Sequence, residues 1–93
     1  MEVTQHDDGK HGHFSATESG TEAGLMSYTW ISENIFSIDH TEVNEAFSGR
    51  GVGKKLLMAT VEFARAKNLK IVPICPFAKS MFDKLEAIRD VLK

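Results

Sequence analysis

A glycine-rich stretch in the middle of the chain constrains the fold more than any other feature of the sequence. Three glycines alternate with other residues in the run Phe47-Ser48-Gly49-Arg50-Gly51-Val52-Gly53-Lys54-Lys55-Leu56. Segments before it read as strands, whereas residues 51–68 place apolar side chains at helical spacing. A glycine turn that opens a helix exposes unpaired backbone N–H groups, and the helix dipole adds positive charge there. We therefore predict a phosphate-binding loop at the centre of a small α/β domain.

The composition is that of one ordinary globular domain. The chain has 93 residues and a net charge of −2, and a general nucleic-acid-binding protein is usually basic. A single cysteine excludes an intrachain disulfide, and no apolar run reaches the roughly 20 residues of a membrane span. We expect a cytoplasmic protein with one domain over residues 1–93, a monomer or weak dimer, without nucleic-acid or membrane partners.

The first half of the chain predicts strands joined by tight turns. Strands are expected around Val3 and over residues 13–17, 23–32 and 35–43. Such short connections make consecutive strands antiparallel. Met26, Tyr28 and Trp30 share one face of the third strand, and we expect that face to lie in the core.

Histidines close to aspartates near the N-terminus raise the question of a metal site. His6, His11 and His13 surround Asp7 and Asp8, but their spacing matches no standard zinc pattern and no cysteine joins them. We interpret this segment as a solvated turn, with a metal site as the minor alternative, and predict no metal.

The second half predicts helix, strand and helix. The first helix should end at Asn68, and a short strand should follow over residues 71–75, where Pro73 indicates an edge or a bulge. A last helix is predicted over residues 77–92, with five apolar side chains inward: Met81, Phe82, Leu85, Ile88 and Leu92. The helical crossover makes the strands that end at Val43 and Cys75 parallel neighbours. The expected fold class is α/β with a mixed sheet, in the order β-β-β followed by β-α-β-α.

Two familiar phosphate loops are excluded by spacing. A P-loop that ended at Gly53-Lys54 would need glycine at Ser48 and a hydroxyl residue at Lys55. A dinucleotide fingerprint that began at Gly49 would need its third glycine at Lys54. A nucleoside triphosphatase and a Rossmann oxidoreductase are therefore poor fits.

A third pattern fits better. The run from His40 to Leu56 resembles the acyl-CoA-binding motif of the GNAT N-acetyltransferases, in which [QR]-x-x-G-x-[GA] follows a strand. Within that family the chain is similar to very small single-domain proteins, whose hallmarks occur here as His40-Thr41-Glu42-Val43, the glycine loop and Pro73-Ile74-Cys75-Pro76. The first position of the motif, [QR] in the family, is Ser48 here, so the chain departs from the family pattern at this point. Arg50 could supply the missing positive charge.

The resemblance implies acetyl-CoA as cosubstrate. Backbone amides from Ser48 to Lys54 would hold its pyrophosphate, and the pantetheine arm would pair with the strand that ends at Val43. The Val43 N–H would then stand near the thioester carbonyl as an oxyanion donor. The candidate binding residues are Val43, Ser48, Gly49, Arg50, Gly51, Val52, Gly53, Lys54 and Lys55.

Three side chains are candidates for catalysis. His40 and Glu42 lie two apart on one strand, so they share a face and either could be the general base. Cys75 could form an acetyl-cysteine intermediate or protonate the leaving thiolate; alternatively it is a small buried hydrophobic residue. The family often places a tyrosine acid in a helix pattern N-x-x-A-x-x-x-Y. Here Cys75 takes the Asn position, and Phe82, which has no hydroxyl, takes the Tyr position.

Three functions remain open after these comparisons. The leading hypothesis is an N-acetyltransferase that moves an acetyl group from acetyl-CoA to an unidentified amine on a small molecule or a protein. The first alternative is a module that binds acetyl-CoA or CoA with weak or no chemistry. The second is a small adaptor whose glycine loop contacts a phosphate-bearing partner.

Overall fold

Four antiparallel strands form the first half of the protein. The computed structural model describes residues 1–93. Its strands are β1 (Glu2–Asp7), β2 (His11–Glu18), β3 (Thr21–Ser32) and β4 (Ile35–Val43). Each of them pairs with the next, so their order in the sheet follows their order in the chain. The predicted strands and their antiparallel pairing are confirmed.

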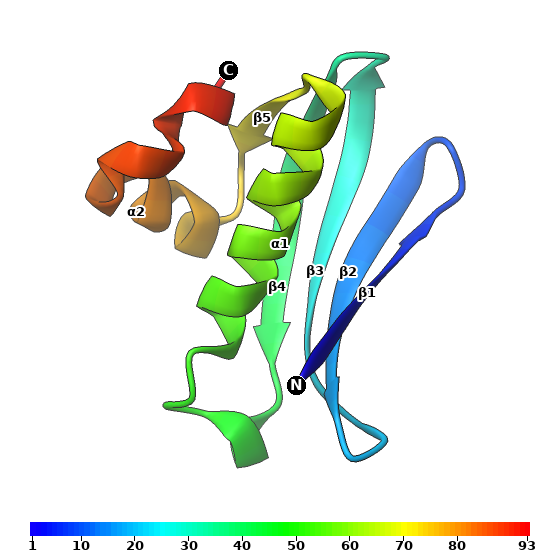
Figure 1. Cartoon of the computed structure of the whole chain (residues 1–93), viewed down its shortest axis with the longest axis vertical. Helices are drawn as coiled ribbons and strands as arrows, with labels where there is room; N and C mark the ends of the chain where they lie inside the picture. The colour runs from blue at the N-terminus through cyan, green and yellow to red at the C-terminus, as the bar shows by residue number, and fades with distance from the viewer.

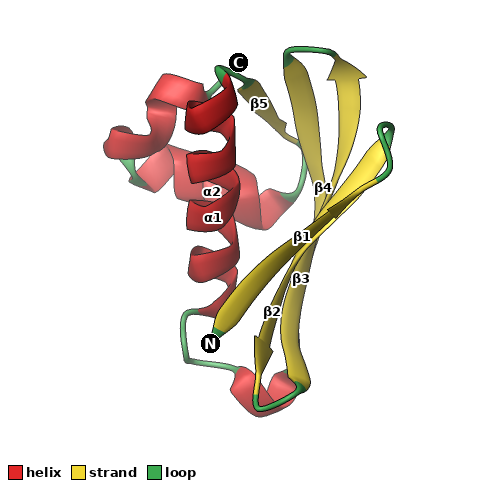
Figure 2. Cartoon of the chain, turned by 45° about the vertical axis from the view of Figure 1, so that its right-hand side comes forward, coloured by secondary structure: helices red, strands yellow, loops and turns green.

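A helical crossover adds a fifth strand in the parallel sense. The 3₁₀ helix η1 (Glu45–Phe47) leads into helix α1 (Val52–Lys67), after which the chain returns to the sheet as β5 (Lys70–Pro73). Strand β5 runs parallel to β4 at the edge of the sheet, as the crossover predicted. The predicted end at Cys75 is wrong, because β5 ends at Pro73 and Cys75 is the N-cap of the later helix α2 (Pro76–Lys84). Figure 1 shows α1 packed along the sheet, and Figure 2 shows α1 and α2 on the same side of it.

The β1–β2 turn is built by aspartate side chains. The Asp7 Oδ1 atom accepts a hydrogen bond from the Gly9 N–H, and the Asp8 Oδ1 atom accepts from the N–H groups of Lys10 and His11. These bonds are typical of aspartate in turns. No group of three or more His, Cys, Asp or Glu side chains is arranged to hold a metal ion.

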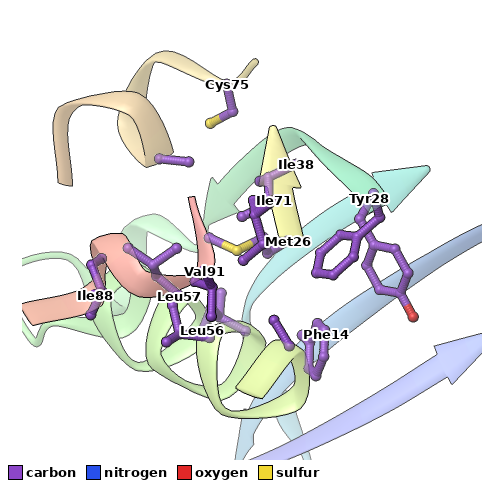
Figure 3. Packing of buried hydrophobic residues seen from close by; sticks show 14 of the residues in the cluster. Phe14, Met26, Tyr28, Ile38, Leu56, Leu57, Ile71, Cys75, Ile88 and Val91 are labelled. Atoms are coloured by element: carbon purple, nitrogen blue, oxygen red, sulfur yellow. The ribbon is translucent and has the colours of Figure 1, made fainter. Parts of the chain in front are cut away.

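The core lies between the sheet and α1. Leu56 and Leu57 of α1 are fully buried and pack in one cluster with Met26 and Ile38 of the strands (Figure 3). Of the predicted core face of β3, Met26 and Tyr28 are buried and Trp30 is half-buried. Because the strands bury one face and the helix buries one stripe, this single interface supplies most of the apolar burial.

The C-terminal end of α1 matches its prediction. Asn68 adopts the left-handed conformation with φ of 59°, and the Leu69 N–H donates to the Ala64 carbonyl at 2.8 Å. Asparagine tolerates this conformation better than most residues, so it ends the helix in the way that glycine often does.

The predicted helix over residues 77–92 is wrong, because two shorter elements replace it. Helix α2 (Pro76–Lys84) ends at Leu85, whose backbone is extended, and the 3₁₀ helix η2 (Glu86–Val91) follows. The guanidinium of Arg89 donates to the carbonyls of Phe82 and Asp83 at 2.8 and 2.6 Å. Arg89 therefore satisfies carbonyls at the end of α2 that a continuous helix would have paired internally. Phe82 and Ile88 are buried as predicted, whereas Leu85 and Leu92 are only half-buried.

None of the helices is long and apolar enough to cross a membrane.

Candidate functional site

The glycine loop presents a run of unpaired backbone amides at the start of α1. Gly49 and Gly51 both adopt positive φ, at 79° and 72°. No backbone carbonyl of the chain accepts a hydrogen bond from the N–H groups of residues 49–54, and the first such donor of α1 is Lys55, to Gly51 at 3.0 Å. The Ser48 N–H, by contrast, donates to the Glu45 carbonyl at 3.1 Å. The run of unpaired amides therefore begins at Gly49, one residue later than predicted. Amides of this kind at a helix N-terminus form an anion site.

Gly53 has a different role from the other two glycines of the loop. It lies inside α1 and is buried, and a Cβ atom added there would come within 2.8 Å of the Phe77 ring. The absence of a side chain therefore lets the start of α1 approach the start of α2. Val52, beside it, is also buried and anchors the first turn of α1 to the core.

The loop carries three cations in different surroundings. Arg50 pairs with Glu18 at the end of β2, at 2.8 Å, and its guanidinium carbon lies 5.1 Å from the centre of the Phe47 ring. Lys54 and Lys55 are exposed and make no ion pair. A hollow of about 570 Å³ on this side of the loop is lined by Arg50, Gly51, Lys54, Lys55, Met58, Met1 and Val3.

Strands β4 and β5 separate before the loop is reached. Their pairing ends at Ile38 and Pro73, and the N–H groups of Ile74 and Cys75 then both donate to the Ile38 carbonyl at 3.0 Å. From residue 39 to Val43, β4 pairs only with β3. The Asn44 N–H donates to Ala23 of β3, so strand alternation turns the Val43 N–H toward the unpaired edge.

A β-bulge lies where the two strands part. Ser27 pairs with His40 and Tyr28 with Ile38, which leaves Asp39 as the extra residue of β4. The bulge lies before His40, so the strand is regular from His40 to Val43. His40 and Glu42 therefore share one face, as predicted, and both are exposed. The intervening residue Thr41 pairs with the buried Met26 of β3 and contacts Cys75 at the start of α2. His40 and Glu42 therefore lie on the face turned away from the helices.

Cys75 lies on the helix side of β4. It occupies the N-cap position of α2, is 4% exposed, and its Sγ atom lies 3.3 Å from Thr41 Oγ1. The structure therefore brings Cys75 to the part of β4 that carries the candidate bases, but on the opposite face from His40 and Glu42.

Two residues of this region were absent from the sequence-based candidates. Thr41 could have been found, because strand alternation alone places it opposite His40 and Glu42. Glu18 offers no such signal, since it precedes Arg50 by 32 residues and belongs to another strand.

Comparisons with known proteins agree with this geometry. A sequence model of the family described as GCN5-related N-acetyl-transferase matches residues 13–91. A GCN5-like protein from Staphylococcus aureus, solved by NMR, is 37% identical and superimposes with a TM-score of 0.73 over 99% of this chain and 87% of its own.

Two further relatives extend the comparison. Protein NATD1 of Xenopus tropicalis is 32% identical over 69 residues, which are 73% of this chain and 63% of that relative. The match therefore leaves more than a third of the relative uncovered. An aminoglycoside N-acetyltransferase in complex with CoA shares the fold, with a TM-score of 0.64 and 14% identity over 94% of this chain and 89% of its own.

Proposed function

We propose, from the premise that the chain belongs to the GCN5-related N-acetyltransferase family, that it binds acetyl-CoA and transfers the acetyl group to an amine. One observation carries the proposal. The unpaired amides of residues 49–54 open α1, and only the short 3₁₀ helix η1 separates them in the chain from the unpaired edge of β4. An anion and an extended chain could therefore be held side by side, as a pyrophosphate with a pantetheine arm requires.

The binding roles follow from the positions of the loop residues. Amides of residues 49–54 would receive the pyrophosphate, with Lys54 and Lys55 adding positive charge. The amide groups of the open edge, that of Val43 among them, would pair with the pantetheine. We keep Val43 as the candidate donor to the thioester oxygen, where a preorganised amide stabilises the oxyanion.

The acetyl transfer itself needs a base and an acid. The amine nitrogen attacks the carbonyl carbon, a C–N bond forms, the C–S bond breaks, and the CoA thiolate takes up a proton. His40 and Glu42 are exposed on the open face of β4, so either can accept the proton of an amine that arrives from solvent.

Cys75 suggests a second mechanism for the acetyl transfer, through a covalent acetyl-enzyme. Its thiolate could attack the thioester and release CoA, and the resulting acetyl-cysteine would pass its acetyl group to the amine. Because Cys75 and the two candidate bases lie on opposite faces of β4, we expect them to serve different steps or different mechanisms.

Phe82 favours the alternative of a binding module with weak chemistry. It stands where related helices often carry a tyrosine acid, is 2% exposed, and has no hydroxyl. A protein that holds acetyl-CoA without efficient turnover remains the second candidate function, and an adaptor for another phosphate-bearing partner is the third.

Calorimetry and mass spectrometry separate these functions. Binding of acetyl-CoA and CoA supports the first two candidates, and no binding at millimolar ligand would contradict both. Release of free CoA thiol with an amine panel identifies turnover. Of Glu42→Gln and His40→Gln, the variant that lowers the rate while the affinity for CoA is kept identifies the base. Acetylation that persists unchanged in Cys75→Ala would exclude Cys75 as the acceptor.

We also propose a cytoplasmic location and a monomer or weak dimer, on the composition described above.

A further inference from the structure

The cation in the middle of the glycine loop already has an anionic partner within the chain. The Arg50 Nη2 atom lies 2.9 Å from one Glu18 carboxylate oxygen and 2.8 Å from the other. The guanidinium also lies over the Phe47 ring, at 5.1 Å from its centre. Side chains from β2 and η1 therefore both contact this charge.

The neighbouring cations differ from Arg50 in this respect. Lys54 and Lys55 line the same hollow but have no carboxylate within ion-pair distance. Arg50 is thus the one cation of the loop whose charge is offset before any ligand arrives.

We propose that Glu18 competes with a ligand phosphate for Arg50 and so lowers the affinity of the glycine loop for CoA. The inference rests on the proposed function and adds a regulatory contact to the same site. Carboxylate and phosphate use the same N–H groups of a guanidinium, so Arg50 can engage one of them fully at a time.

The exchange favours the phosphate once the ligand is bound. The side chains of Arg50 and Glu18 are 48% and 33% exposed, so the pair is screened by solvent and weak. A pyrophosphate at the loop carries more charge than one carboxylate and is held by the backbone amides as well. Arg50 then turns from the end of β2 to the ligand, and the strength of the ion pair is subtracted from the binding free energy.

Calorimetric titration of CoA into three proteins tests the competition. Glu18→Gln removes the competitor, and Glu45→Gln is the matched control, because Glu45 is an exposed carboxylate of the same loop region without an ion-pair partner. At low ionic strength Glu18→Gln should lower Kd by about two- to fivefold relative to Glu45→Gln, the size expected for an exposed pair. At about 0.5 M salt the difference should largely disappear. Equal or weaker binding by Glu18→Gln would overturn the proposal, since Glu18 would then be neutral or would position Arg50 for the ligand.

A second measurement tests the competition for Arg50 separately from the proposal that CoA is the ligand. The Glu18 carboxyl ¹³C resonance of the wild-type protein is followed by NMR during titration with CoA and, separately, with inorganic pyrophosphate. Displacement predicts a shift toward the value seen in Arg50→Gln. If pyrophosphate produces that shift and CoA does not bind, the ion-pair exchange stands while the proposed function fails. Saturation of the loop amides without a shift at Glu18 contradicts the exchange, and no binding of either probe contradicts both.

Discussion

The Sγ atom of Cys75 lies 3.3 Å from the Oγ1 atom of Thr41, and this contact joins the start of α2 to the unpaired part of β4. It places the only thiol of the chain next to the edge where we propose that the thioester lies. The contact also gives the thiol a polar neighbour in an otherwise apolar position, since Cys75 belongs to the core cluster.

Removing the Thr41 hydroxyl should slow the chemistry of Cys75. A hydroxyl can donate a hydrogen bond to the thiolate that reacts, and a bond to a charged group is stronger than one between neutral groups. Thr41→Val keeps the shape without the hydroxyl, and the rate of iodoacetamide alkylation of Cys75 near pH 8 should fall by about tenfold, as for loss of a bond to a charged group. Thr41→Ser is the control and should react at close to the wild-type rate. Equal rates in Thr41→Val and the wild type would show that the contact has no effect on reactivity.

Stability at extreme pH should depend on the partly buried hydrogen bond between Tyr28 and Asp7, near the β1–β2 turn. Burial alone would raise the pKa of Asp7, but hydrogen bonds from Tyr28, the Gly9 N–H and Trp30 offset it and lower that pKa below its ordinary 3.8. The stabilisation is therefore present above pH 3.8 and is lost as the pH falls through the lowered value. Burial and the same Asp7 contact raise the pKa of Tyr28 above its ordinary 10.0, so its contribution is present below pH 10 and is lost as the pH rises further.

Urea unfolding between pH 2 and 11 measures both effects. Asp7→Asn should flatten the dependence of the unfolding free energy on pH below 4, and Tyr28→Phe should flatten it above 10. Asp83→Asn is a suitable control, because that carboxylate is exposed and has no ion-pair partner. If the unfolding free energy of Asp7→Asn depends on pH below 4 as that of the wild type does, other carboxylates cause the dependence.

Local patterns predicted the parts of the fold that local chemistry determines. The strand over residues 35–43 and the helix that ends at Asn68 were predicted at their observed positions, because alternation, helical spacing and cap residues act over a few neighbours. The glycine loop was predicted for the same reason.

Features fixed by distant partners were missed. The break at Leu85 depends on Arg89 reaching back to α2, and helical spacing alone continues through it. The bulge at Asp39 is set by the register with β3, and the pair of Arg50 with Glu18 joins residues of two separate elements. The position of Cys75 opposite the candidate bases also required the structure.

Gly53→Val should lower the stability of the protein rather than act on the ligand alone. A Cβ at this position would come within 2.8 Å of the Phe77 ring, and the added methyl groups would approach further. Overpacking of this kind costs about 1–3 kcal/mol. The loss should appear as a lower urea midpoint, and the double variant Gly53→Val with Phe77→Ala should recover part of it. A midpoint equal to that of the wild type would show that α2 moves aside freely.

Gly51 gives the cleaner test of the loop. A Cβ atom there would touch no other residue, so glycine is needed only for its backbone conformation. A Cβ there has nothing within 4 Å, but φ is 72°, which a β-branched residue adopts only at a cost of about 1–2 kcal/mol or more. Gly51→Val should therefore distort the amides of residues 49–54 and raise Kd for CoA by at least about tenfold, which corresponds to 1.4 kcal/mol. Gly51→Asn is the matched variant, because asparagine tolerates positive φ, and its Kd should stay within a few fold of the wild type. If both variants bind CoA equally well, the left-handed turn at Gly51 is not what presents the amides, and the anion must be held elsewhere on the chain.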